Sequence, residues 1–266
     1  MYSCGIDIGS KMIKVVLLDD RKTVAKSNVL SGFDQNASVE SALNTAMQQI
    51  SITKSEITNI AATGVARKVI YLQPPINANI ETAEVLADIK GAIDIHPSAR
   101  VVIDVGAEEG KAVRCDEKGK VIDFVSNERC AAGAGVFIEA MSRALEIDVQ
   151  DFGALALQSQ KTIPMNSQCT VFAESEVISL LHSNITKEDI ARSVNDAIAG
   201  RVASMTRRIG LENDLVLVGG MAKNVGYVEA MKRTLQTDVI VLPEPEFIGA
   251  YGAALTAAEY QQNESN

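Results

Sequence analysis

Two cysteines lie in stretches whose composition could place reactive sulfur at the start of a helix. Cys130 is followed by Gly133 and Gly135 and then by apolar residues at helical spacing, and Cys169 directly precedes another such run. The N-terminus of a helix carries a partial positive charge, which lowers the pKa of a thiol and stabilises its anion. The sequence therefore predicts thiolates at Cys130 and Cys169.

Two thiolates are too few for the metal sites that cysteine usually builds. A tetrahedral zinc site and a [4Fe–4S] cluster each take about four cysteine ligands. If Cys130 and Cys169 bind metal, a second subunit must supply the other two ligands. This suggests one cluster on a two-fold axis between two subunits. The alternative is that each cysteine is a small buried hydrophobic residue.

A repeated pattern of an acid and a glycine predicts a duplicated fold. An apolar strand leads into Asp7 and Gly9, and a second strand follows at once, which predicts a β-hairpin. The pattern recurs 97 residues later at Asp104 and Gly106. An internal duplication at this period predicts two similar α/β halves that face each other across a cleft.

Opposed hairpin tips of this kind could grip a nucleoside triphosphate with its Mg²⁺. Backbone N–H groups at glycine turns approach phosphate oxygens closely, and aspartates hold Mg²⁺ through its waters and orient an attacking water. Asp7 and Asp104 are thus candidate catalytic acids, and Gly9 and Gly106 candidate phosphate-binding residues. Lys11 could also contact phosphate, although a solvated hairpin face explains it equally well.

A third glycine turn lies in the C-terminal half. A strand predicted over residues 215–218 leads into Gly219 and Gly220 and then a helix start. Such a turn lets a flat ring or a phosphate lie against bare backbone.

Apolar spacing and capping signals place the other elements. Thr186 is predicted to cap a long helix, because an acid follows it three residues later. The boundary between the two lobes is predicted near His96, which gives an N-terminal lobe over residues 1–97 and a C-terminal lobe with the cysteine helices over residues 98–266. Further helices are predicted over residues 39–50 and 82–95 and from Phe247, with a last strand near residues 239–242.

Composition restricts the classes of partner and compartment. The chain has 266 residues, of which 47% are hydrophobic and 22% charged, so it can build a substantial core. Its net charge of −9 argues against nucleic acid as a partner. The absence of a signal peptide and of a disulfide framework predicts a cytoplasmic protein, and Cys4 and Cys115 are predicted to be core residues. No apolar run reaches the roughly 18 residues that span a bilayer.

Taken together, these motifs resemble the ATP-dependent activators of 2-hydroxyacyl-CoA dehydratases and the related ATPase subunits of benzoyl-CoA reductase. The resemblance covers nearly the whole chain and is strongest over residues 127–135 and 169–179, where the second stretch reads Cys-Thr-Val-Phe-Ala-Glu-Ser-Glu-Val-Ile-Ser. It implies the α/β fold of the acetate kinase, sugar kinase, Hsp70 and actin superfamily, a duplicated ATPase fold with two lobes around a nucleotide cleft.

The resemblance also implies a cofactor set and partners. It implies a dimer with one [4Fe–4S] cluster ligated by Cys130 and Cys169 of both subunits, and ATP with Mg²⁺ in each subunit. Hydrolysis would change the angle between the helices that hold the cluster. An electron, received from a ferredoxin or flavodoxin, would pass at low potential to an iron–sulfur dehydratase or reductase.

Site residues are carried over on the matching positions. The first phosphate loop would hold Asp7, Gly9 and Ser10, and the second Asp104 and Gly106. The turn near the adenosine would hold Gly219, Gly220 and Asn224.

The second loop departs from the activators, which usually read Asp-Ile-Gly-Gly-Gln-Asp there. Ala107 narrows the loop. Glu108 is a candidate catalytic residue. Its carboxylate replaces the amide of the family pattern and would repel the γ-phosphate unless Mg²⁺ or Lys111 balances its negative charge. This loop looks more like the D-type subunit of benzoyl-CoA reductase, so the dimer could be a homodimer or a heterodimer with a related ATPase chain. A second departure is Asp88, where the family has a histidine four residues after a glutamate.

Two rival functions remain open. A small-molecule kinase of the same fold would need a catalytic acid for a substrate hydroxyl and would have no use for the cysteines. A non-catalytic subunit that binds nucleotide and cluster would explain Glu108.

Overall fold

The chain folds into two compact units. The computed structural model describes residues 1–127, 134–165, 170–212 and 214–264. Unit 1 contains residues 1–98 together with 247–266, and unit 2 contains residues 99–246. The predicted division is therefore wrong for the C-terminal segment, which was assigned to the second lobe. This segment belongs to unit 1 because its helix packs on the first sheet.

Unit 1 is built on a five-stranded sheet in the order β3-β2-β1-β4-β5. The first three strands are antiparallel, whereas β4 and β5 run parallel to β1. Its elements are β1 (Tyr2–Ile8), β2 (Met12–Asp19), β3 (Lys22–Leu30), α1 (Gln35–Gln49), β4 (Ile57–Thr63), β5 (Ile80–Glu81), α2 (Glu84–Ile95) and α8 (Ile248–Glu264), with short 3₁₀ turns at Lys54–Glu56 and Arg67–Val69.

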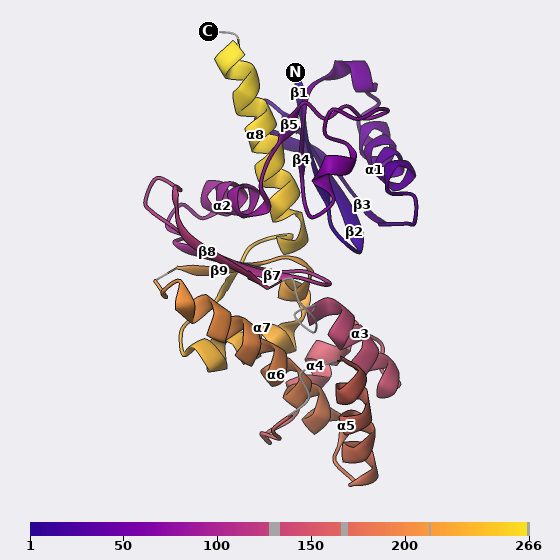
Figure 1. The fold of residues 1–266 in the computed structure, drawn as a ribbon, viewed down its shortest axis with the longest axis vertical. Helices are drawn as coiled ribbons and strands as arrows, with labels where there is room; N and C mark the ends of the chain where they lie inside the picture. Colours follow the sequence, from indigo (N-terminus) through magenta and orange to yellow (C-terminus); the bar gives the residue numbers. More distant parts are fainter. Residues whose placement is uncertain (128–133, 166–169, 213, 265–266) are drawn as a thin grey trace. The chain divides into compact units, whose positions relative to one another are not determined.

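The two faces of this sheet are covered by different helices. Along β2, Val15 and Leu17 join a core with α1, whereas Val16 and Leu18 join a core with α8. This alternation follows from the two-residue period of a strand. Helices α1 and α8 accordingly lie on opposite faces of the sheet (Figure 1). Burial of each such side chain contributes about 1.5–3 kcal/mol relative to exposure.

Helix α8 approaches the sheet closely because β1 presents a glycine to it. A Cβ atom added at Gly5 would overlap the backbone of Ala250 and Ala254. Ala250 and Ala254 thus meet the sheet directly, and α2 packs on α8 through Gly91 and Gly252.

Unit 2 repeats the topology of unit 1. Its sheet, read from the antiparallel edge, has the order β8-β7-β6-β9-β10, with β9 and β10 parallel to β6. The predicted internal duplication is confirmed by this match. The elements are β6 (Val101–Val105), β7 (Gly110–Cys115), β8 (Val121–Asn127), α3 (Ala134–Ala144), α4 (Phe152–Ala156), α5 (Thr170–His182), α6 (Lys187–Arg208), β9 (Leu215–Val218), α7 (Val225–Leu235) and β10 (Ile240–Val241), with 3₁₀ turns at Gly220–Lys223 and Pro245–Phe247.

One face of the second sheet packs under a layer of helices. Ile103 and Leu217 from the sheet share a core with Phe137 of α3, Ile198 of α6 and Tyr227 of α7. Thr186 caps α6 by accepting a hydrogen bond from the backbone N–H of Asp189, as predicted. Within the described parts of the chain, no helix is both long and apolar enough to cross a membrane.

Candidate functional site

The first candidate loop is the tip of the β1–β2 hairpin. Asp7 lies opposite Lys14 in the antiparallel register, and Lys14 Nζ is 2.9 Å from Asp7 Oδ2. A Cβ atom added at Gly9 would lie 2.9 Å from the carbonyl oxygen of Met12, so only glycine fits this turn. Ser10 and Lys11, both half-buried, complete the tip. The predicted hairpin is confirmed, and Asp7 is held by an ion pair to Lys14.

The second candidate loop is the tip of the β6–β7 hairpin. Asp104 lies opposite Lys111 in the same register as Asp7 and Lys14. Lys111 Nζ is 2.6 Å from Glu109 Oε2, and the Lys111 side chain is nearly buried. Glu108 is exposed. The structure therefore pairs Lys111 with Glu109, whereas the sequence suggested Lys111 as compensation for Glu108.

The amides of the two turn glycines close the hairpins. The N–H of Gly9 donates to the carbonyl of Met12 at 3.1 Å, and the N–H of Gly106 donates to that of Glu109 at 2.9 Å. These glycines shape the turns. Contact of the following residues, Ser10 and Ala107, with phosphate remains a prediction.

A glycine in the left-handed conformation lies against each acid. Gly64 (φ +91°) follows β4, and Gly219 (φ +84°) follows β9. A Cβ atom added at Gly64 would lie 2.5 Å from Asp7 Oδ1, and one added at Gly219 would overlap Asp104 Oδ1. Sequence reasoning identified Gly219 and missed Gly64. The signal that would have found it is the duplication, because Gly64 and Gly219 follow the strands that pair with the two acids.

The predicted adenosine turn contains one open position and one helix cap. No atom lies within 4 Å of a Cβ atom added at Gly220. Asn224 caps α7, since its Oδ1 accepts a hydrogen bond from the N–H of Tyr227 at 3.0 Å. Gly220 thus offers bare backbone, while Asn224 already has a structural role. A contact of either residue with adenosine remains a prediction.

The first turn of α3 rests on the second hairpin tip. The N–H of Gly135 donates to the carbonyl of Gly106 at 3.2 Å, and the N–H of Val136 donates to that of Ala107 at 3.0 Å. A Cβ atom added at Gly135 would lie 2.9 Å from the Cα of Ala107. Gly135 is therefore a packing glycine that allows a helix to contact the loop through its backbone.

A second carboxylate lies near Asp7 in unit 1. Asp88, on α2, is only 4% exposed. A Cβ atom added at Gly249 would lie 3.1 Å from Asp88 Oδ1 and 3.9 Å from Asp7 Oδ2. Gly249, in the first turn of α8, therefore lies close to both acids, and sequence reasoning did not connect these three residues.

The predicted metal ligands Cys130 and Cys169, and the neighbouring Gly133, lie outside the described residues. Within the described ranges, no group of three or more His, Cys, Asp or Glu side chains could hold a metal ion. Cys4 and Cys115 are buried free thiols, and burial raises the pKa of each. They are core residues, as predicted.

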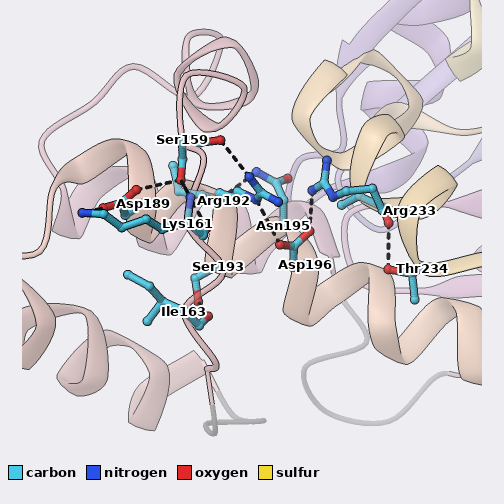
Figure 2. A network of polar contacts seen from close by, with 12 residues as sticks. Ser159, Lys161, Ile163, Asp189, Arg192, Ser193, Asn195, Asp196, Arg233 and Thr234 are labelled. Carbon is cyan, nitrogen blue, oxygen red and sulfur yellow. Dashed lines mark hydrogen bonds and ion pairs between the residues drawn. The ribbon is translucent and has the colours of Figure 1, made fainter.

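A polar network holds the segment that leads toward Cys169 (Figure 2). Asp189, near the start of α6, accepts hydrogen bonds from Ser159 Oγ at 2.7 Å and from Lys161 Nζ at 3.2 Å. Arg192 Nη1 donates to the carbonyl of Ser159 at 2.8 Å, and Ser193 Oγ donates to that of Ile163 at 2.6 Å. Helix α6 thus fixes the backbone of this segment.

The replacement Asp189→Asn is expected to destabilise the protein in a pH-dependent way. The hydrogen bond from Ser159, with those from Lys161 and Thr186, holds the pKa of Asp189 below its usual value. A lowered pKa in the folded state stabilises the protein above the unfolded-state pKa of about 3.9, and this contribution is lost as the pH falls through the folded-state value. The melting temperature of the variant should therefore be lower than that of the wild type at pH 7, and the difference should shrink in acid.

The matched control is Asp238→Asn, because Asp238 is an exposed carboxylate on the same unit. It should leave the melting temperature unchanged at both pH values. A difference for Asp189→Asn that stays constant with pH would contradict the electrostatic explanation.

Comparison with known proteins gives a match along almost the whole chain. The model of the BadF/BadG/BcrA/BcrD ATPase family matches residues 4–257. The activator of lactoyl-CoA dehydratase from Anaerotignum propionicum is 39% identical over 262 residues, which cover 98% of this chain and 99% of that protein. The D-type subunit of benzoyl-CoA reductase from Thauera aromatica is 30% identical over 267 residues, covering 96% and 93% respectively.

A solved structure is similar over the same extent. The activator of the 2-hydroxyisocaproyl-CoA dehydratase from Clostridium difficile, with bound ADPNP, has a TM-score of 0.93 to this chain at 34% sequence identity. The match covers 100% of this chain and 97% of that one. Sequence and fold therefore agree on one set of relatives.

Proposed function

Since the chain belongs to the BadF/BadG/BcrA/BcrD ATPase family, we propose that it is an ATP-hydrolysing activator that passes a low-potential electron to an iron–sulfur acyl-CoA dehydratase or reductase. Members of the family are ATPases, and the duplicated fold is of the actin/Hsp70 type, as the resemblance implied. Two relatives are named activators of hydroxyacyl-CoA dehydratases. These names support the activator role for this chain.

The observation that carries the proposal is the contact of α3 with the second hairpin tip. Two backbone hydrogen bonds join the first turn of α3 to Gly106 and Ala107. In the sequence, α3 begins four residues after Cys130. A change in the loop on nucleotide hydrolysis would therefore be passed to the helix that follows a proposed cluster ligand. Such a link is what an ATP-driven electron donor requires.

The chain's own residues supply the proposed nucleotide chemistry. Asp7 and Asp104 would hold Mg²⁺ through its waters and orient the water that attacks the γ-phosphate. The amides of Ser10 and Ala107 would donate to phosphate oxygens. Lys14 orients the Asp7 carboxylate through its ion pair. Gly219 and Gly220 would form the surface against which adenosine packs.

The proposed cluster ligands are Cys130 and Cys169 of two subunits. The helices that follow them in the sequence, α3 and α5, pack together: Phe137 and Met141 of α3 share a core with Ala173 and Val177 of α5. This packing supports a common site for both cysteines. A [4Fe–4S] cluster supplies one-electron reduction, and four thiolates from a dimer would complete it. A ferredoxin or flavodoxin would reduce the cluster again after each electron transfer.

An exposed Glu108 favours a second candidate function, a subunit that binds nucleotide and cluster without hydrolysing ATP. Its carboxylate at the loop tip would repel the γ-phosphate. Phosphate release at the background rate from a dimer loaded with iron and nucleotide would favour this function over the activator.

The test of the proposed function is the iron and labile sulfide content per chain, with the oligomeric mass, after anaerobic purification. We expect a dimer with about two irons per chain, because one four-iron cluster would serve two subunits. An iron-free monomer that still binds ATP after reconstitution would exclude the electron-transfer function and leave the fold assignment intact.

A further inference from the structure

Arg67 contacts the backbone of the glycine that lies against Asp7. Arg67 Nη1 donates to the carbonyl oxygen of Gly64 at 3.1 Å, and the N–H of Arg67 donates to the same oxygen at 3.3 Å. Gly64 in turn lies directly against Asp7, because a Cβ atom added at Gly64 would be only 2.5 Å from Asp7 Oδ1. The other oxygen of Asp7 is held by Lys14. The carboxylate is thus fixed from both sides.

The guanidinium of Arg67 is itself anchored by two acids of unit 1. Its Nε donates to Glu81 Oε1 at 2.9 Å, and its Nη1 lies 3.7 Å from Glu84 Oε1. The side chains are mostly buried, with exposed fractions of 26% for Arg67, 29% for Glu81 and 20% for Glu84. A planar guanidinium, whose N–H donors have fixed directions, can bind a carbonyl and a carboxylate at the same time. Arg67 therefore ties the Gly64 turn to β5 and to the start of α2.

Unit 2 contains the same turn without the arginine. The N–H of Ala222 donates to the carbonyl of Gly219 at 3.2 Å, as the N–H of Arg67 does to that of Gly64. Gly219, like Gly64, has a positive φ. The backbone turn consequently forms without any guanidinium, so the turn alone does not explain Arg67. What Arg67 adds is a second donor to the carbonyl of the glycine that lies against Asp7.

We propose that Arg67 is a positioning residue for ATP hydrolysis, acting through the Gly64 carbonyl on the Asp7 carboxylate. This inference rests on the proposed function, in which Asp7 orients the Mg²⁺-bound water. Loss of the guanidinium removes the second donor to the Gly64 carbonyl and the tie to Glu81. The backbone turn still forms, but Gly64 is then held less firmly against Asp7 Oδ1. Displacement of a catalytic group by about 1 Å can lower a rate about 100-fold.

The test compares Arg67→Ala with Arg21→Ala in the full-length protein. Arg21 is the matched control, because it also binds two carboxylates of unit 1, Asp94 at 2.7 Å and Glu259 at 3.3 Å, away from Asp7. Steady-state hydrolysis, the Mg²⁺ concentration for half-maximal rate, ADP affinity by calorimetry and the melting temperature are measured for each variant.

For Arg67→Ala we expect kcat to fall about 10- to 100-fold and the half-maximal Mg²⁺ concentration to rise, while ADP affinity changes by less than about threefold. Arg67→Lys should recover only part of kcat, because one ammonium group cannot bind both the Gly64 carbonyl and Glu81. Arg21→Ala should keep the wild-type kcat. If Arg67→Ala does not fold, Glu81→Gln, which weakens the anchor of Nε, should show a smaller fall in kcat.

Two results would overturn the inference. One is wild-type kcat in Arg67→Ala with a loss of melting temperature equal to that of Arg21→Ala, which would make Arg67 structural only. The other is a parallel loss of ADP affinity and kcat, which would make it a direct nucleotide ligand. Failure of the proposed function is distinct, because the wild type itself would then hydrolyse no ATP.

Discussion

Replacing Gly219 by Ala is expected to reduce ATP hydrolysis about 100-fold or more and to destabilise unit 2. An alanine there would have to adopt φ +84°, and its Cβ would overlap Asp104 Oδ1 and lie 2.6 Å from the carbonyl oxygen of Val105. With ψ at 175°, this backbone lies in a region that is essentially restricted to glycine, and it costs about 1–3 kcal/mol for a residue with a Cβ atom. Asp104 must then move, and the second hairpin tip loses its carboxylate geometry. Phosphate release and thermal unfolding measure the two effects.

The neighbouring Gly220→Ala variant is the control for folding. No atom lies within 4 Å of an added Cβ atom, and Gly220 lies outside the left-handed region, so its melting temperature should match the wild type. Any loss of nucleotide affinity in Gly220→Ala would then report the proposed packing of adenosine on this backbone. Equal stability and equal hydrolysis in Gly219→Ala and the wild type would refute the geometry described for Asp104.

Gly135→Ala is expected to uncouple the nucleotide from the activator function. Its Cβ would lie 2.9 Å from the Cα of Ala107, so the first turn of α3 must move away from the second hairpin tip. The two backbone hydrogen bonds that carry the proposed link would lengthen. We expect the ATP-dependent change in the visible spectrum of the reconstituted dimer, and electron delivery to a partner enzyme, to fall about tenfold or more. Affinity for ADP should change much less.

The control for this helix substitution is Gly200→Ala on α6. An added Cβ meets no atom within 4 Å there, and alanine is favoured over glycine inside a helix by about 1 kcal/mol. This variant should keep full coupling and gain slight stability. Coupling at the wild-type level in Gly135→Ala would show that α3 does not transmit the nucleotide state.

The sequence predicted the hairpins well because their signals are local. The alternation of apolar residues and the glycine turns defines β1 with β2 and β6 with β7, and the register opposes Asp7 to Lys14 and Asp104 to Lys111. The cap at Thr186 defines the start of α6 in the same way. These features depend on neighbours in the chain, so local pattern was sufficient.

Features that depend on distant segments were missed or assigned wrongly. Gly64 matters because β4 pairs with β1, which brings it against Asp7 across more than fifty intervening residues. The pairing of Lys111 with Glu109 depends on how the hairpin tip bends. The assignment of α8 to unit 1 depends on tertiary packing of small residues against Gly5. Local spacing carries no information on such contacts.

The comparisons refine one inference from the second loop. Ala107 and Glu108 suggested similarity to the D-type subunit of benzoyl-CoA reductase. Over the whole chain, however, identity is 39% to a dehydratase activator and 30% to that reductase component. Overall identity is thus higher to that activator than to that reductase component.

Unit 1 consists of two segments of the chain that are separated by unit 2, so the ribosome synthesises its two parts at different times. Residues 99–246 form one uninterrupted stretch, so unit 2 can form its core without any later segment of the chain. The first sheet, although synthesised earlier, must wait for α8, whose Ala250, Ala254 and Leu255 cover Val16 and Leu18. At roughly 5–20 residues per second, this apolar face stays uncovered while the whole of unit 2 is made. Until α8 has been made, the nascent chain can therefore aggregate through this uncovered face of the first sheet.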